Sequence, residues 1–75
     1  MTRCKVRCTQ ISKMLGWGTT PILWKVSLAP VPREQSPENA ALFEADAQGF
    51  IEFSAIRADR FSVGSYYYVD FTETE

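Results

Sequence analysis

Histidine is absent from this chain of 75 residues, and its cysteines are Cys4 and Cys8 alone. Structural zinc sites are built from sets of Cys and His ligands, commonly with a Cys-x-x-Cys pair, so the sequence predicts no metal site. The two cysteines lie in a segment that alternates like a strand. At roughly 3.3 Å per residue their Cα atoms would be about 13 Å apart, beyond the roughly 7 Å that a disulfide tolerates, so we expect free thiols.

Long apolar runs are also missing. No stretch approaches the roughly 18 apolar residues of a membrane-spanning helix, and residues 1–7 lack the apolar region of a secretion signal. We therefore expect a soluble intracellular protein that does not associate with membranes, in agreement with reduced cysteines. The sequence contains no nucleophile motif and no ligand cluster, so we expect no enzyme activity, no catalytic residues and no cofactor.

The chain has enough residues for one domain, residues 1–75. A chain of this length buries only about 60–65% of the surface that its unfolded form exposes, so its core is marginal. Disulfides and metals are the usual means of stabilising such a core, and neither is expected here. Oligomerisation is the means that remains, and we expect a homo-oligomer.

Charge is nearly balanced in total, with a net value of −1, but it is divided along the chain. Residues 1–37 hold six basic side chains and one acidic one, whereas residues 38–75 hold two basic and eight acidic ones. This division predicts that basic and acidic strands pair within the fold or across a subunit boundary. A general nucleic-acid-binding protein is normally much more basic, so nucleic acid is not the expected partner.

Alternating apolar and polar residues predict four strands, at 3–11, 22–31, 50–56 and 61–72, with a loop at 13–21. The fold class is mainly β (α+β): a β-β-α-β-β antiparallel sheet or partly closed small barrel with one short helix. We expect the first strand to pair with the second and the third with the fourth, and the last strand to be central. The expected core residues are Val6, Cys8, Trp24, Val26, Leu28, Leu42, Ile51, Phe53, Phe61, Tyr67, Val69 and Phe71.

The one predicted helix covers residues 36–45. Ser36 is suited to the N-cap, Pro37 to the first helical position, and Glu38 to the positive end of the helix dipole. Gly49 is expected to supply the left-handed residue that ends the helix.

Tyrosines and basic residues share the sheet face that we expect opposite the core. Cations neutralise phosphates and tyrosine rings stack on bases, so this face is a candidate nucleotide site. The alternative is an ordinary solvated face with ion pairs to Glu52 and Asp70. Phe50 is expected on the same face, and two loop arginines could also hold phosphate. The candidate ligand-binding residues are Arg3, Lys5, Arg7, Lys25, Tyr66, Tyr68, Arg57 and Arg60.

Trp17 lies between two glycines in the predicted loop. Its indole either folds back over the core or stands out to bind a partner. In the second case the protein could inhibit a host enzyme through an aromatic patch or through a free edge strand. A single-strand nucleic-acid module of the OB type is the last alternative, because that fold needs five strands and the sequence predicts four.

Several segments resemble a family of small bacteriophage proteins of about 70–80 residues. They are Ser36-Pro37-Glu38-Asn39 with Phe43 behind it, Gly49-Phe50-Ile51-Glu52-Phe53, and Gly64 followed by Tyr67-Tyr68-Val69-Asp70-Phe71-Thr72. Phe53 stands where leucine is more usual, and Trp17 and Trp24 lie in a region that varies. The resemblance implies a non-enzymatic protein in the host cytoplasm that counters a host defence. Together with the tyrosine face, it suggests sequestration of a cyclic nucleotide immune signal.

Overall fold

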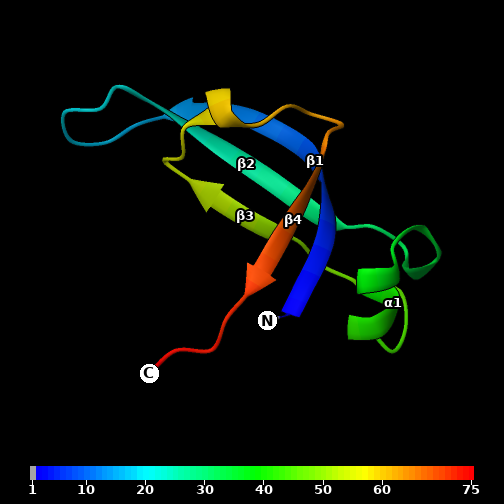
Figure 1. The fold of residues 1–75 in the computed structure, drawn as a ribbon. Coiled ribbons are helices and arrows are strands. Elements are labelled where there is room, and N and C mark those ends of the chain that lie inside the picture. The colour runs from blue at the N-terminus through cyan, green and yellow to red at the C-terminus, as the bar shows by residue number, and fades with distance from the viewer. Residues whose placement is uncertain (1) are drawn as a thin grey trace.

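The computed structural model describes residues 2–75, which form one antiparallel sheet with a short α-helix at its side (Figure 1). The strands are β1 (Thr2–Leu15), β2 (Ile22–Pro30), β3 (Ile51–Ser54) and β4 (Tyr66–Phe71), and the helix is α1 (Pro37–Leu42). Two single 3₁₀ turns, η1 (Arg33–Gln35) and η2 (Ala58–Arg60), lie in the connections. The expected β-rich fold with one helix is confirmed, in the form of an open sheet and not of a closed barrel.

β1 and β2 form the long central hairpin. The predicted pairing is confirmed, but β1 continues beyond Ile11 to Leu15, which lies opposite Ile22 and shortens the predicted loop. The register shifts between Cys8 and Gln10, so β1 contains a bulge. Because the bulge adds one residue, the apolar face moves from even-numbered residues before it to odd-numbered residues after it. Ile11 therefore packs against the core opposite Val26.

The strand order in the sheet is β3-β2-β1-β4. The predicted pairing of the third and fourth strands is wrong, because β3 pairs with β2 and β4 pairs with β1. β4 is thus an edge strand and not a central one. The cause lies in the connection after β3. It begins at Ala55, whose φ is +61°, and runs over the core face instead of turning back, so that β4 reaches the other side of β1 in a Greek-key order.

Helix α1 starts as its sequence predicts. Ser36 is the N-cap, its hydroxyl accepts a hydrogen bond from the backbone N–H of Asn39, and Pro37 begins the helix. The helix ends earlier than expected, at Leu42, and the following residue Phe43 is extended. Gly49 has a positive φ of 111° but lies seven residues after Leu42, so it shapes the loop and does not end the helix.

The core is small and lies on one face of β1 and β2. Its fully buried cluster comprises Cys4, Val6, Cys8, Val26 and Leu28, and Ile51, Phe61, Tyr67 and Val69 pack partly buried against it. Both cysteines are free, as expected, and burial raises the pKa of the Cys4 thiol. The residues of the described range include no helix that is long and apolar enough to cross a membrane.

Four predicted core residues are exposed: Trp24, Leu42, Phe53 and Phe71. Phe53 lies on the edge strand β3, directly opposite Val26 and on the same face, but no second layer covers it. Phe71 ends the other edge strand, and Trp24 lies near the tip of the hairpin. Leu42 is exposed because α1 packs beside β1 and not over the core (Figure 1). Trp24, Phe53 and Phe71 therefore point to the predicted face but stay exposed, because they lie at the edges or the end of the sheet.

Candidate ligand-binding face

The pairing of β1 with β4 brings basic residues and tyrosines together. Arg7 lies opposite Tyr66, Lys5 opposite Tyr68, and Arg3 opposite Asp70. These side chains project from the sheet face opposite the core, since Cys4 and Val6 between them point inward. We call the set Arg3, Lys5, Arg7, Tyr66 and Tyr68 the cation–tyrosine face.

Each tyrosine of this face has a cation against its ring. The guanidinium of Arg3 lies 4.8 Å from the ring centroid of Tyr68. The ammonium of Lys5 and the guanidinium of Arg7 lie 5.0 Å and 5.6 Å from the centroid of Tyr66. Both tyrosines are about half exposed, at 50% and 54% of their surface. The rings are thus held by cation–π contacts while much of each remains open to solvent.

Arg3 is bound to a carboxylate on the same face. Its Nε and a terminal nitrogen donate to the two oxygens of Asp70 at 2.6 Å and 3.1 Å. These hydrogen bonds hold the pKa of the Asp70 carboxyl below its ordinary value, and they raise the pKa of the Arg3 guanidinium. This ion pair is one of the two that the alternative of an ordinary solvated face predicted. Arg3 therefore has part of its binding capacity occupied within the fold.

Lys5 and Arg7 are the cations of the face with free binding capacity. Neither forms an ion pair with any residue in the described range 2–75. Arg7 is oriented by a hydrogen bond from its Nε to the backbone oxygen of Gly64 at 3.3 Å. Both cations lie over Tyr66, so a positive charge and an exposed aromatic ring occur at the same place. Basic side chains that contact phosphates and aromatic rings that stack on bases occur together in nucleic-acid-binding grooves, so this place on the face is the candidate binding site.

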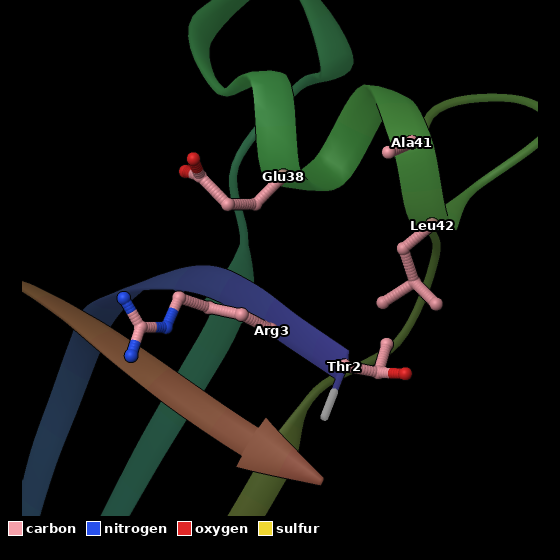
Figure 2. A pocket seen from close by; sticks show the side chains of 5 residues that line it. All are labelled: Thr2, Arg3, Glu38, Ala41 and Leu42. Atoms are coloured by element: carbon pink, nitrogen blue, oxygen red, sulfur yellow. The ribbon is translucent and has the colours of Figure 1, made fainter.

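A hollow of about 480 Å³ adjoins the face where β1 begins. It is lined by Thr2 and Arg3 from β1 and by Glu38, Ala41 and Leu42 from α1. In Figure 2 the side chain of Arg3 lies over β4, and Glu38 extends from the helix toward the same side. The carboxylate of Glu38 makes this end of the face less favourable for an anion than the end at Tyr66.

Three predicted ligand residues lie elsewhere. The Nζ of Lys25 lies 3.8 Å from the Oε1 of Glu52, on the expected sheet face but opposite Ser12, beyond the bulge from the cation–tyrosine face. This is the second ion pair that the solvated-face alternative predicted, so both ion pairs of that alternative are present. Arg57 precedes η2 and Arg60 is its last residue, and this segment packs on the core face of the sheet. The structure therefore separates Lys25, Arg57 and Arg60 from the cation–tyrosine face.

Two other aromatic residues also lie away from this face. Phe50 precedes β3, is 66% exposed and lines a hollow with Ser27, Ala29 and Glu52 on the expected sheet face, but β2 and β1 separate it from Tyr66. Trp17 is at the tip of the β1–β2 hairpin and is 62% exposed, so it does not cover the core. Leu15 and Ile22 close the hairpin next to it and are exposed as well. The hairpin tip is thus an apolar surface at the far end of the sheet from α1 (Figure 1).

Asn39 is a supporting residue that the sequence analysis missed. Its side chain is fully buried, accepts from the backbone N–H of Lys5 at 2.7 Å, and donates to the backbone oxygens of Lys5 and Val31, both at 2.9 Å. β2 stops pairing with β1 at Pro30, and the Asn39 side chain forms hydrogen bonds to β1 just beyond that point. These bonds fix the position of the Lys5 backbone. Only its place within Ser36-Pro37-Glu38-Asn39 marks it in the sequence, and that motif indicates a cap and not a contact with β1.

Residues 2–75 contain no group of three or more Cys, Asp or Glu side chains placed to hold a metal ion. Comparison of the chain with protein-family models, with curated proteins and with solved structures found no match. Support for a function therefore comes from the geometry of the cation–tyrosine face and from the sequence resemblance to bacteriophage proteins.

Proposed function

We propose that this protein binds and sequesters a nucleotide through the cation–tyrosine face. The ligand class that we propose is a cyclic nucleotide of host immune signalling, and the protein is a non-enzymatic phage protein that counters this defence in the host cytoplasm. The observation that carries the proposal is the placement of Lys5 and Arg7 over the exposed ring of Tyr66.

The chemistry of the face favours a ligand with both phosphate and base. Lys5 and Arg7 are available to a phosphate, and a base can stack on the open side of the Tyr66 or Tyr68 ring. Stacking of a base on an aromatic side chain contributes about 1 to 3 kcal/mol. Arginine adds planar stacking and paired hydrogen bonds to phosphate oxygens. The bacteriophage resemblance supports immune signalling as the source of such a ligand.

Native mass spectrometry of the purified protein with a mixture of cyclic di- and trinucleotides tests the proposal. We expect peaks in which the protein carries a nucleotide mass in a fixed ratio. Bare peaks with every nucleotide, at low and moderate salt, would contradict it.

Variants then locate the site. Tyr66→Ala and Arg7→Ala should each weaken binding about tenfold or more, because each removes a stacking or phosphate contact of about 1 to 3 kcal/mol. Trp17→Ala and Arg60→Ala are matched controls, since they remove an exposed aromatic ring and an exposed arginine away from the face. Equal losses in controls and site variants would show that the ligand binds elsewhere.

The hairpin tip supports a second candidate function, inhibition of a host enzyme by direct binding. Trp17 is exposed beside Leu15 and Ile22, and aromatic anchors surrounded by apolar residues dominate many protein interfaces. A pull-down from host lysate should then recover one stoichiometric partner with the natural protein and none with Trp17→Ala. Recovery of no partner by either protein would count against this candidate.

A further inference from the structure

β4 has an unused set of backbone hydrogen-bonding groups. The N–H of Cys8 donates to the oxygen of Ser65 at 2.9 Å, whereas the oxygen of Lys5 accepts from Val31 on the opposite side of β1 at 3.1 Å. Even-numbered residues of β1 before the bulge therefore direct their backbone groups to β4. Opposite them lie Tyr67 and Val69, whose backbone N–H and C=O groups form their hydrogen bonds with β1. Tyr66, Tyr68 and Asp70 consequently direct theirs to the free edge.

The two edges of the sheet differ in how well they are protected. β3 has four residues, carries the charged Glu52, and ends at Ala55 in a left-handed conformation. Short, charged and interrupted edges resist pairing with other chains. β4 has six residues with no proline and no lysine, and its single charged residue, Asp70, is neutralised by Arg3. The β4 edge therefore lacks the usual protection against pairing.

We propose that β4 pairs antiparallel with β4 of a second copy of this chain, about a twofold axis at Tyr68. In this register Tyr68 lies opposite Tyr68 of the second copy, and Tyr66 lies opposite its Asp70. All three residues with outward backbone groups then find partners. A shift of two residues along the strand moves the twofold axis to Tyr67 or Val69 and leaves one of the three without a partner on β4. The register centred on Tyr68 therefore forms the most hydrogen bonds.

Side chains on both faces are compatible with this register. On the outer face, Asp70 of the second copy stands opposite Tyr66 and remains paired with its own Arg3, so it adds no free negative charge beside Lys5 and Arg7. On the core face, the half-buried Tyr67 of one copy meets Val69 of the other, which extends the apolar surface across the boundary. Two copies thus form one continuous sheet. The added contact between Tyr67 and Val69 enlarges a core that is small in the single chain.

The second copy completes the candidate site. The two cation–tyrosine faces adjoin, with both Tyr68 rings at the axis and the same cations on either side. Insofar as the proposed function holds, this symmetry favours a ligand with two phosphates and two bases, a cyclic dinucleotide, over a mononucleotide. The pairing itself needs no ligand, so it is tested in the absence of nucleotide and independently of the proposed function.

Size-exclusion chromatography with light scattering tests the pairing. We expect the natural protein at twice the chain mass of 8.5 kDa. Tyr68→Pro removes the central outward N–H from both copies without removing a bond to β1. Because the dimer then lacks two hydrogen bonds, its dissociation constant should rise by about tenfold or more. Tyr68→Ala keeps the N–H and should keep the dimer. Ser54→Pro, on the β3 edge, should also remain dimeric.

A cysteine cross-link tests the same register without weakening the edge. Tyr68→Cys places two thiols opposite each other at a Cα separation of about 5.5 Å, within the range of a disulfide. Mild oxidation should convert this variant to a covalent dimer, whereas Ser54→Cys should stay uncoupled. The native thiols are buried and compete little. A monomeric natural protein, or a dimer that fails to cross-link at position 68, would overturn the proposal.

Discussion

At the scale of single residues, the structure shows which charges of the tyrosine face are engaged. Arg3 and Asp70 satisfy each other, with two hydrogen bonds between their side chains, while Lys5 and Arg7 meet only aromatic rings and a backbone oxygen. Cation–π contacts of this kind also stabilise the sheet, because they join neighbouring strands. Arg3 is paired with Asp70, whereas Lys5 and Arg7 have no ion pair within residues 2–75. For this reason we place the candidate site at Tyr66 and not at Arg3.

The Arg3–Asp70 pair leads to a prediction about pH. The pKa of the Asp70 carboxyl is lowered in the folded protein, so its contribution to stability is present above the ordinary Asp pKa of about 3.9 and is lost as pH falls through the lowered folded value. Asp70→Asn should therefore destabilise the protein at neutral pH, and this difference should vanish in acid. Urea unfolding of both proteins across this range measures it.

Asp59→Asn is the matched control for this prediction. Asp59 lies on the exposed turn η2 and forms no ion pair among residues 2–75. Its replacement should change stability little, because no ion pair is lost. A pH-dependent loss in Asp59→Asn as large as that in Asp70→Asn would show that the pair is not the cause.

At the scale of elements, the docking of α1 on β1 depends on Asn39, whose side chain forms the hydrogen bonds that the backbone of a neighbouring strand would otherwise form. β2 ends at Pro30, and the residues of β1 before Val6 would otherwise have free groups on that side. Asn39 provides one acceptor and two donated hydrogen bonds there, so a helix of six residues takes the place of a neighbouring strand. This contact fixes the backbone of Lys5 and keeps its side chain on the tyrosine face.

Asn39→Ala should consequently destabilise the protein by about 2 to 3 kcal/mol, because it leaves buried backbone groups without partners. Ala40→Gln is the control in the same helix, since Ala40 is exposed and glutamine is a good helix former. Chemical unfolding of the three proteins gives the free energies. A loss below about 0.5 kcal/mol in Asn39→Ala would mean that water replaces the side chain without cost.

At the scale of the whole molecule, the core is small for the number of apolar residues in the chain. The fully buried cluster has five members, while large aromatic residues such as Phe50, Phe53 and Phe71 remain exposed. An open sheet covered on one face by a few loops cannot enclose more. A stable molecule of this size needs further burial, and the free β4 edge is where we propose that it occurs.

Stability should therefore respond strongly to small losses in the core. Val26→Ala removes methyl groups from a site with no exposed surface and should cost about 2 kcal/mol. Val63→Ala makes the same chemical change at a residue that is 61% exposed and should cost less than about 0.5 kcal/mol. Thermal unfolding compares the two. Equal costs would mean that Val26 is not part of a cooperative core.

Much of this architecture follows from short-range patterns in the sequence. Alternation predicted the two faces of β1, β2 and β4, including which tyrosines share a face with Arg3, Lys5 and Arg7. The Ser36-Pro37 start of α1 was predicted from capping chemistry, and the free thiols from strand spacing. These features depend on neighbours within a few residues, where backbone geometry alone determines direction and distance.

Strand order, burial at the edges and the role of Asn39 were decided by the tertiary structure. β3 and β4 are adjacent in sequence, but their connection crosses the core, and β4 pairs with β1 because a long first strand offers it an open side. Phe53 and Phe71 have the expected direction yet remain exposed, since no layer lies over the edges. The sequence by itself determined which way the side chains of β2, of β4 and of β1 before its bulge point. Which surfaces meet was decided by contacts between distant segments, which no local pattern specifies.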